Sequence, residues 1–400
     1  MSEMKNILML SLARFDDVNT STTFELAREF ADTNHVLIVE HPYTWTELLR
    51  SLVGRKGWIR LVATILTRPL IKTKRNVKVL VPPAVLPTNF LSKGKWYQRL
   101  TRWNDRIISS RVNRWLSKEK WDKYDFINSY NYHFPSLGNS LHGTQTKKVY
   151  HCVDPLVKAY TRKHGVRNQQ KAVRNSDMVI STAPQLQREW ETEKPSFMVP
   201  NAVNYEHFNS PQKYDPKIRS LGKKIVGYFG AIERRIDYTM LIDTFKANPE
   251  WTLVMAGPVE EAYLPEEIRS LPNVHFIGKY TYDQLPSLIY SVDVTIIPFK
   301  IEEASKSIYP LKLYEYMSTG KPIVCTKFNP ELLDPISDKV YAADNTEDLQ
   351  DAIVVALNDR DIEGVLRRKS FAAMNTWEHR AKRFLNYLNQ KKDVQIEKSY

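Results

Sequence analysis

The sequence predicts an α/β protein made of two parallel β-sheets, each covered by helices. Short apolar segments alternate with helical segments along all 400 residues, a pattern typical of parallel sheets. The alternation restarts near residue 200, so each half has the size of one domain. No apolar run approaches the ~20 residues that a membrane-spanning helix needs. We therefore expect two doubly wound domains in tandem, with ligands at the carboxyl ends of the strands and in a cleft between the domains.

The first half is predicted to contain seven strands with helices between them. Its opening apolar run, 7–13, is too short for the core of a signal peptide and leads into two aspartates, so it is interpreted as the first strand. Helices are expected at 22–31 and 96–116. The predicted strands are 7–12, 36–40, 77–81, 126–128, 149–153, 178–181 and 197–199.

The second half repeats the alternation with six strands. The polar segment 213–224, punctuated by proline and glycine, is typical of a linker between domains. The predicted strands are 225–229, 251–256, 274–277, 294–297, 323–325 and 340–342. The predicted helices are 238–247, 283–290, 311–318, 346–358 and 361–376, with a last helix at 377–389 before a charged tail.

The positive charge is concentrated in the first half. The chain has 58 Lys and Arg against 45 Asp and Glu, a net charge of +13. Residues 1–200 hold 32 basic and 17 acidic side chains, whereas residues 201–400 hold 26 and 28. Between Glu47 and Asp105 there are thirteen Lys and Arg and no carboxylate. Such a block fits a solvated basic face, a nucleic-acid site or an anionic membrane surface.

The apolar neighbours of this block favour the membrane surface. Large aliphatic side chains and tryptophans recur every three or four residues over 45–53 and 58–66, with Lys and Arg between them. That composition is typical of a pair of amphipathic helices lying in a membrane interface, although the same residues could also pack into a core. No zinc-finger, RRM or KH signature is present, so we expect no nucleic acid. Cys152 and Cys325 lie in apolar runs and suit a reducing cytosol.

The segment 307–324, SIYPLKLYEYMSTGKPIV, is the most informative about chemistry. Pro310 is expected to begin a helix, whose free N–H groups suit an anion. Lys312 and Glu315 lie three residues apart and therefore on one helical face. A cation for phosphate beside a carboxylate for sugar hydroxyls suits a nucleotide sugar, and the spacing also fits an ordinary surface ion pair. The motifs of dinucleotide-binding, P-loop, serine-hydrolase and zincin proteins are absent.

This segment resembles the donor site of GT-B glycosyltransferases, especially bacterial ones (family 1/4-like) of teichuronic-acid and exopolysaccharide biosynthesis. So do, in order, VPNAVNYEHF, GYFGAIERRIDY, LVMAGPV and LPNVHFIGKYTYDQLPSLIYSVDVTIIPF. The resemblance implies two Rossmann-like domains facing a cleft and a C-terminal helix that crosses back to the first domain. The implied division is an acceptor domain at 1–204, completed by 377–400, and a donor domain at 205–376.

The resemblance also implies roles for residues of the donor site. Lys312 and Arg235 would hold the donor diphosphate, a point charge beside a forked guanidinium. Glu315 would bind the ribose, Gly257 would let the backbone approach the nucleotide, and Tyr280 would flank the base. Backbone amides would meet phosphate oxygens in the segment made by Ser307, Ile308 and Tyr309. Many retaining members carry a glutamate where this chain has Ser307, so the stereochemical outcome stays open.

Three residues are candidates for catalysis on the acceptor side. Asp154 follows a predicted strand and could deprotonate an acceptor hydroxyl, or it could be an ordinary turn or cap residue. Asp17, in the first strand–helix loop, is the rival base and could equally cap a helix. His133 follows the fourth strand, near where some retaining members place a histidine that contacts the donor sugar.

We therefore expect a metal-independent hexosyltransferase that uses a UDP- or GDP-sugar as co-substrate and needs no other cofactor. Its acceptor is expected to be a saccharide, lipid-linked, in bacterial surface polysaccharide biosynthesis. The expected location is cytoplasmic, peripheral on the inner face of the cell membrane. A nucleotide-sugar 2-epimerase of the same fold and a nucleic-acid-binding protein that uses the basic block remain alternatives.

Overall fold

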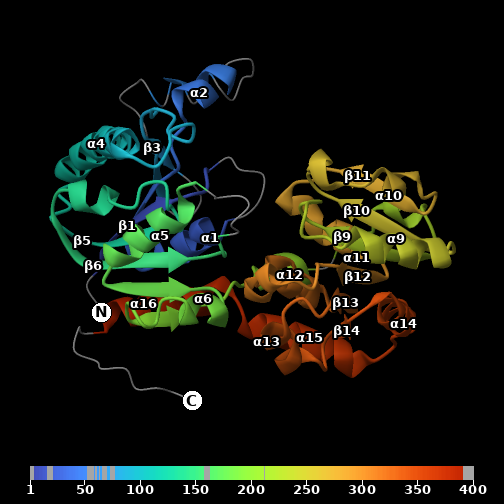
Figure 1. The fold of residues 1–400 in the computed structure, drawn as a ribbon. Helices are drawn as coiled ribbons and strands as arrows, with labels where there is room; N and C mark the ends of the chain where they lie inside the picture. The colour runs from blue at the N-terminus through green and yellow to red at the C-terminus, as the bar shows by residue number, and fades with distance from the viewer. Residues whose placement is uncertain are drawn as a thin grey trace. The chain divides into compact units, whose positions relative to one another are not determined.

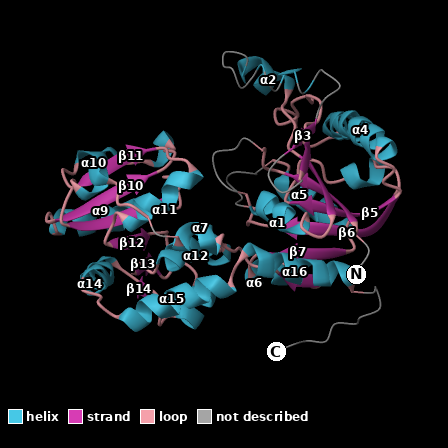
Figure 2. Ribbon diagram, turned by 180° about the vertical axis from the view of Figure 1, so that it is seen from behind, coloured by secondary structure: helices cyan, strands magenta, loops and turns pink. Residues whose placement is uncertain are grey.

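The computed structural model describes residues 4–15, 21–51, 58, 61–62, 64, 70–72, 77–156, 163–210 and 212–390. The chain divides into two compact units (Figure 1). The N-terminal unit is Met1–Pro200 with Ala381–Tyr400, and the C-terminal unit is Asn201–Arg380. The predicted domain limits at 204 and 376 fall close to these. Each unit is a largely parallel sheet with helices packed on it, so the predicted α/β class is confirmed (Figure 2).

The sheet of the N-terminal unit has the order β3-β4-β2-β1-β5-β6-β7-β8. All neighbouring strands pair in parallel except β3, which is antiparallel to β4. Every strand predicted for this half is found, and β3 was not predicted. The bounds are β1 Asn6–Ser11, β2 His35–Val39, β3 Leu70–Lys72, β4 Lys78–Leu80, β5 Lys123–Ser129, β6 Thr144–Cys152, β7 Met178–Ser181 and β8 Ser196–Met198.

Helix α4 shows how the helices of this unit pack on the sheet. It buries Ile108, Val112, Trp115 and Leu116, at helical spacing, in one cluster with the apolar faces of β1 and β2. The predicted amphipathic helix at 45–53 is α2, and of the second predicted helix only positions 58, 61, 62 and 64 are described, all helical. The helices are α1 Thr22–Phe30, α2 Trp45–Ser51, α4 Lys95–Lys118, η2 Leu137–Ser140, α5 Gly165–Arg174 and α6 Pro184–Arg188.

The sheet of the C-terminal unit has the order β11-β10-β9-β12-β13-β14 and is parallel throughout. The chain therefore winds outward from β9 in one direction and then from β12 in the other. Loops that leave these two strands diverge at their carboxyl ends, where doubly wound sheets bind ligands. The strands, all six predicted, are β9 Lys224–Phe229, β10 Trp251–Ala256, β11 Val274–Gly278, β12 Val294–Ile297, β13 Ile323–Thr326 and β14 Tyr341–Ala343.

The predicted linker at 213–224 is wrong, because this segment belongs to the body of the C-terminal unit. It contains the short helix α8, Pro216–Arg219, which is capped by the Asp215 carboxylate and buries Ile218. The other helices are α7 Tyr205–Asn209, α9 Tyr238–Ala247, η3 Glu261–Tyr263, α10 Glu266–Ser270, η4 Tyr282–Gln284, α11 Leu285–Tyr290, η5 Glu303–Ser307, α12 Leu311–Thr319, α13 Pro330–Leu333, η6 Asp334–Ile336, α14 Thr346–Leu357 and α15 Ile362–Met374.

The last helix, α16 Trp377–Asn389, returns the chain to the N-terminal unit, as predicted. Phe384 is fully buried and meets Phe30 of α1 edge to face at 5.3 Å. Tyr387 stacks on Phe197 of β8 at 4.4 Å. Both views place α16 beside α6 (Figures 1 and 2). Across the described ranges, no helix combines the length and apolarity that crossing a bilayer requires.

Candidate functional site

Two glycines bring the loops after β9 and β10 into backbone contact. Gly230 follows β9 with φ +152° and Gly257 follows β10 with φ +145°, values that side-chain-bearing residues rarely adopt. A Cβ added to Gly257 would lie 1.9 Å from the Gly230 carbonyl oxygen. Only glycine therefore fits at position 257. Each glycine directly follows its strand, so the contact lies at the carboxyl edge of the sheet.

The side chain that approaches this edge is Lys312, in the first turn of α12. Its Nζ donates to the Tyr228 hydroxyl at 2.7 Å and lies 4.0 Å from the centre of that ring. It also lies 4.9 Å from the ring of Phe299, which follows β12. A Cβ on Gly230 would come within 2.6 Å of Nζ, so this glycine leaves the space that the ammonium fills. Lys312 therefore lies where β9 and β12 diverge.

The environment of Lys312 disfavours its charge. Burial is the main cause, and the nearby Arg235 guanidinium the second, of a pKa of the ammonium that is lowered to about 7. Glu315 and Glu233 act in the opposite direction but do not compensate. An anion bound beside this lysine would raise its pKa again. The site thus holds a cation whose charge lacks full compensation, which is the electrostatic character that a diphosphate needs.

Arg235 reaches the same edge from the loop between β9 and α9. It forms an ion pair with Glu233, and its guanidinium carbon lies 5.8 Å from the centre of the Phe299 ring. The backbone oxygen of Glu233 accepts a hydrogen bond from Tyr238 at 3.0 Å, which ties this loop to α9. The structure therefore brings together the two cations to which the sequence assigned the diphosphate.

Glu315 lies one turn further along α12 and is only 9% exposed. Its charge raises the pKa of Lys312. Burial raises the pKa of Tyr280, and the charge of Glu315 raises it further. Tyr280 follows β11, so the two side chains come from elements far apart in the sequence. Lys312, Glu315 and Tyr280 therefore share one neighbourhood, and an ordinary surface ion pair does not describe the buried Glu315.

The segment before α12 is anchored by its carbonyl groups. Ser307, Ile308 and Tyr309 are all buried. The Ile308 oxygen accepts from the Asn329 amide at 3.1 Å, and the Tyr309 oxygen accepts from the Asn201 amide at 2.6 Å. The Ile308 N–H donates to the Ser305 oxygen at 3.0 Å. The predicted phosphate contact is therefore not available to the Ile308 amide in this conformation.

Four residues of this neighbourhood were not singled out from the sequence. Gly230 had a usable signal, because a glycine directly after the first strand of such a sheet marks a close approach of the backbone. No local pattern marks the others, whose roles come from contacts across the fold. These residues are Tyr228, Gly230, Glu233 and Phe299.

The corresponding edge of the N-terminal unit, where β1 and β5 diverge, contains His133. Its ring lies 5.1 Å from that of His41, centre to centre. Burial lowers the pKa of His133 to about 4 and that of His41 well below its usual value, so both are neutral near pH 7. The Asn131 amide donates to the Ser11 oxygen at 2.8 Å and lies 3.3 Å from His41 Nδ1. Sequence analysis missed His41 and Asn131, which carry no local motif.

Of the two candidate catalytic bases, Asp154 and Asp17, the structure describes only Asp154. Asp154 is exposed in a bend just after β6. Its charge contributes to raising the pKa of Tyr130, for which burial is the larger cause, and Tyr130 donates to the Pro155 oxygen at 3.2 Å. Asp154 is thus accessible and close to the loop after β5. Asp17 lies outside the described residues.

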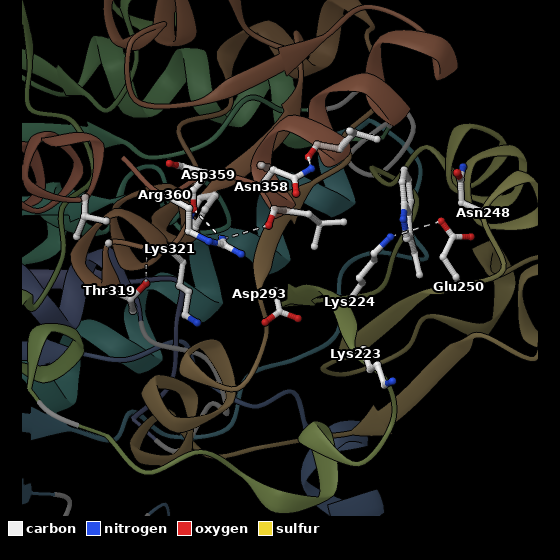
Figure 3. Close-up of a pocket in the computed structure, with 17 residues that line it drawn as sticks. Lys223, Lys224, Asn248, Glu250, Asp293, Thr319, Lys321, Asn358, Asp359 and Arg360 are labelled. Atoms are coloured by element: carbon white, nitrogen blue, oxygen red, sulfur yellow. Dashed lines mark hydrogen bonds and ion pairs between the residues drawn. The ribbon is translucent and has the colours of Figure 1, made fainter. Parts of the chain in front are cut away.

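A cavity of about 680 Å³ in the C-terminal unit lies at the opposite edge of the sheet (Figure 3). It is lined by residues at the amino ends of the strands, including Lys224 and Lys321. Lys224 pairs with Glu250 at 3.9 Å, and Lys321 Nζ donates to the Val292 oxygen at 2.7 Å. Because these cations have partners and ligands of doubly wound sheets bind at the carboxyl ends, we do not assign the donor to this cavity.

Part of the chain resembles known proteins in sequence. Residues 223–359 match the family Glycosyl transferases group 1. A Bacillus subtilis (strain 168) protein named as a teichuronic acid biosynthesis glycosyltransferase, TuaH, is 29% identical over 132 residues. That alignment spans 32% of this chain and 33% of the relative. The matched family and the Bacillus subtilis relative are both described as glycosyltransferases. The epimerase alternative is therefore not favoured.

Solved structures share the fold of the whole chain. Sucrose-phosphate synthase from Thermosynechococcus elongatus has a TM-score of 0.68 at 14% identity, covering 96% of this chain and 98% of its own. Anabaena Alr3699/HepE in complex with UDP has a TM-score of 0.64 at 15% identity, covering 96% and 99%. Trehalose-6-phosphate synthase from Burkholderia multivorans has a TM-score of 0.66 at 10% identity, covering 96% of both chains. The predicted GT-B fold is thereby confirmed.

Proposed function

We propose that this chain, whose residues 223–359 match the family Glycosyl transferases group 1, moves a sugar from a nucleotide diphosphate sugar to a saccharide acceptor. The observation that carries the proposal is the position of Lys312. An incompletely compensated cation lies where ligands of this fold bind, inside the segment that matches the family. The UDP bound to Alr3699/HepE supports uracil as the base of the donor.

The donor site works by electrostatics and positioning. Lys312 and Arg235 hold the diphosphate and stabilise the negative charge that develops on it as the bond to the sugar breaks. Glu315 accepts hydrogen bonds from the ribose hydroxyls, and Tyr280 lies against the base. Gly257 lets the backbone approach the nucleotide. With two cations to neutralise the leaving group, we propose that transfer needs no metal ion, and we expect chelation with EDTA to leave the rate unchanged.

The acceptor hydroxyl is activated by a carboxylate. Asp154 takes the proton as the hydroxyl oxygen bonds to the anomeric carbon, and the nucleoside diphosphate leaves with the electrons of the broken bond. Its exposure after β6 supports this role. Asp17 is the rival base. The neutral His133 binds a hydroxyl of the donor sugar. Replacing Asp154→Asn should lower kcat about 10²–10⁴-fold and leave nucleotide binding unchanged.

The test of the proposed donor site is a nucleotide-binding screen followed by a transfer assay. UDP, GDP, ADP, CMP and dTDP are compared by thermal shift, since a ligand at 100 times its Kd stabilises by about 2.7 kcal/mol. We expect UDP to give the largest shift. In Glu315→Gln, the preference for UDP over 2′-deoxy-UDP should fall, because a neutral amide oxygen accepts a weaker hydrogen bond from the hydroxyl than a carboxylate does. If no nucleotide shifts the wild-type protein at millimolar concentration, the proposal fails.

The location at a membrane surface is a second part of the proposal. Several large apolar side chains of the N-terminal unit are exposed, and many of its surface residues are basic, a combination that favours binding to anionic lipid. We infer that this unit lies on the inner leaflet and extends a lipid-linked saccharide for a surface polysaccharide. The exposed side chains are Trp45, Leu49, Trp58, Val62, Phe90, Trp96 and Trp103.

Flotation with vesicles tests this part. Trp96→Ala with Trp103→Ala should weaken binding to phosphatidylcholine vesicles that contain phosphatidylglycerol. The matched control is Ile362→Ala with Leu366→Ala, which removes two exposed apolar side chains from α15 of the C-terminal unit. Equal flotation of both double variants would count against a membrane face on the N-terminal unit.

A further inference from the structure

A second cavity, of about 470 Å³, lies in the N-terminal unit between helices α4 and α5. Five cationic side chains line it, and none has a carboxylate within 4 Å among the residues that the structure describes. Arg102 donates through Nε to the Gln98 backbone oxygen at 3.2 Å, but no acidic group neutralises its charge. Exposed cations gathered without an acidic partner create a positive potential that favours an anion. These residues are Lys93, Arg102, Arg167, Lys171 and Arg174.

Asp105 of α4 adds a carboxyl group to the lining. It is only 4% exposed, and its Oδ1 has no hydrogen-bond partner among the described residues. A buried carboxyl oxygen without a partner costs stability, so its retention indicates a ligand with hydrogen-bond donors. Burial raises the pKa of Asp105 to about 7, and the nearby Lys171 ammonium acts in the opposite direction. A hydrogen bond donated by a ligand would offset part of the cost of burying this carboxyl group.

One wall of the cavity is fixed by aromatic and amide contacts. The rings of Tyr97 and His164 stack at 3.6 Å and 6°. The Asn168 amide donates to the Tyr97 hydroxyl at 2.8 Å, and His164 Nε2 lies 3.1 Å from the Leu91 oxygen. These contacts hold the first turns of α4 and α5 together. The cavity is therefore formed before any ligand enters it.

We propose that this α4–α5 cavity binds the phosphate ester of a polyol. The cations hold the phosphate, with the guanidinium groups of Arg102, Arg167 and Arg174 suited to two-point contacts. Asp105 accepts a hydrogen bond from a polyol hydroxyl. The volume is that of a small-molecule site. A use of this cavity as part of the acceptor site rests on the proposed function, whereas the binding itself does not.

The polyol phosphate can come from a lipid headgroup or from a soluble sugar phosphate. Side chains beside the cavity favour the lipid. Phe90 is 69% exposed, and its backbone oxygen accepts from Lys163, next to His164 in sequence. Trp96 is 70% exposed and directly precedes Tyr97 of the cavity wall. Aromatic side chains at these places would enter the interface of a membrane whose headgroup occupies the cavity.

Two binding measurements without nucleotide test the proposal and distinguish the sources. Calorimetry with glucose 1-phosphate probes the soluble ligand, and flotation with phosphatidylcholine vesicles, with and without phosphatidylglycerol, probes the headgroup. The pocket variant is Arg167→Gln with Arg174→Gln. The matched control is Arg106→Gln with Arg114→Gln, two exposed arginines of α4 outside the cavity. We expect the pocket variant to weaken binding of at least one probe about tenfold or more, and the control to weaken it much less.

Asp105→Asn distinguishes recognition of the phosphate from recognition of the polyol. This variant should bind inorganic phosphate at least as well as the wild type, because a negative charge is removed. Its preference for glucose 1-phosphate over inorganic phosphate should fall. Binding of phosphatidylglycerol vesicles alone assigns the cavity to a headgroup, and binding of glucose 1-phosphate assigns it to a soluble ester. Equal losses in the pocket and control variants, or no wild-type binding of either probe, would overturn the proposal.

Discussion

Six strands of the N-terminal sheet, β4-β2-β1-β5-β6-β7, follow the same order as the six strands of the C-terminal sheet. The two units carry different chemistry at the point where the direction of winding reverses. In the C-terminal unit, β9 and β12 diverge around Lys312, a cation whose pKa is lowered to about 7 and which has Arg235 beside it. In the N-terminal unit, β1 and β5 diverge around His41 and His133, both neutral near pH 7, and the amide of Asn131. One edge suits a diphosphate, and the other suits hydroxyl groups.

The difference shows that topology determines where a ligand binds and the loops determine which ligand. Both sheets place loop residues at their carboxyl edges for the same geometric reason. The C-terminal unit adds two close glycines and a helix that carries a lysine in its first turn. The N-terminal unit adds rings and amides that exchange hydrogen bonds.

Removing the central cation should have the largest effect. We expect Lys312→Ala to lower the transfer rate about 10²–10³-fold and to abolish the thermal shift caused by nucleotide, because the charge that faces the diphosphate is lost. His133→Asn should leave the Kd of the nucleotide unchanged. Lys306→Ala is the control, since Lys306 is an exposed lysine of the preceding turn that pairs with Glu303 at 2.7 Å. An unchanged rate in Lys312→Ala would remove the contrast between the two edges.

The backbone contact between the glycines should be the next most sensitive feature. Gly257→Ala forces a Cβ against the Gly230 oxygen at 1.9 Å and should cost about 2–4 kcal/mol in the free energy of unfolding. Gly278→Ala is the matched control, because its φ is +79° but nothing lies within 4 Å of the added Cβ. It should cost only about 1–2 kcal/mol. Denaturant titration of both variants compares them, and equal costs would mean that the loop contact is unimportant.

The neutral histidine should make stability depend on pH below neutrality. The pKa of His133 is about 4 in the folded protein, below its unfolded value near 6.5. Between these values the unfolded chain binds the extra proton, so stability falls as the pH falls from 6.5 towards 4. The contribution is about 1–3 kcal/mol, and His133→Asn should flatten the dependence of the free energy of unfolding on pH by that amount. A curve with an unchanged slope in the variant would show that His133 is not held neutral.

The smallest effect should be on the pH dependence of nucleotide binding. Lys312 loses its proton above its pKa of about 7, and a bound diphosphate favours the charged form. Affinity should therefore decline as the pH rises above 7, by at most about tenfold per pH unit. Lys312→Arg keeps the charge at every accessible pH and should remove the decline, even if it binds more weakly. Calorimetry at pH 7, 8 and 9 measures this, and a decline that persists in the arginine variant would assign it to another group.

Periodicity and spacing predicted the fold well because it depends on local signals. Every predicted strand is present, since each is a short apolar run bounded by polar residues. The antiparallel β3 was missed because it has only three residues. The linker at 213–224 was misjudged because its proline and glycine accompany a capped helix with one buried isoleucine.

The candidate site was predicted only as far as it is local in sequence. Lys312 and Glu315 share a helix turn, so their spacing revealed them. The contacts of Lys312 with Tyr228 and Phe299 join residues more than ten positions apart, and no pattern in one sequence encodes them. His41 was missed for the same reason, because only the fold brings it to His133.

The return of α16 to the N-terminal unit has a consequence for synthesis. The ribosome makes Phe30 and Phe197 before the C-terminal unit, but their partners Phe384 and Tyr387 follow that unit. The apolar surface that α16 covers in the N-terminal unit therefore stays exposed to solvent while the C-terminal unit is translated. The C-terminal unit can fold as soon as it emerges, whereas the first unit to be made is the last to be completed. A ribosome stalled before residue 381 would leave that apolar surface accessible to chaperones and to other nascent chains.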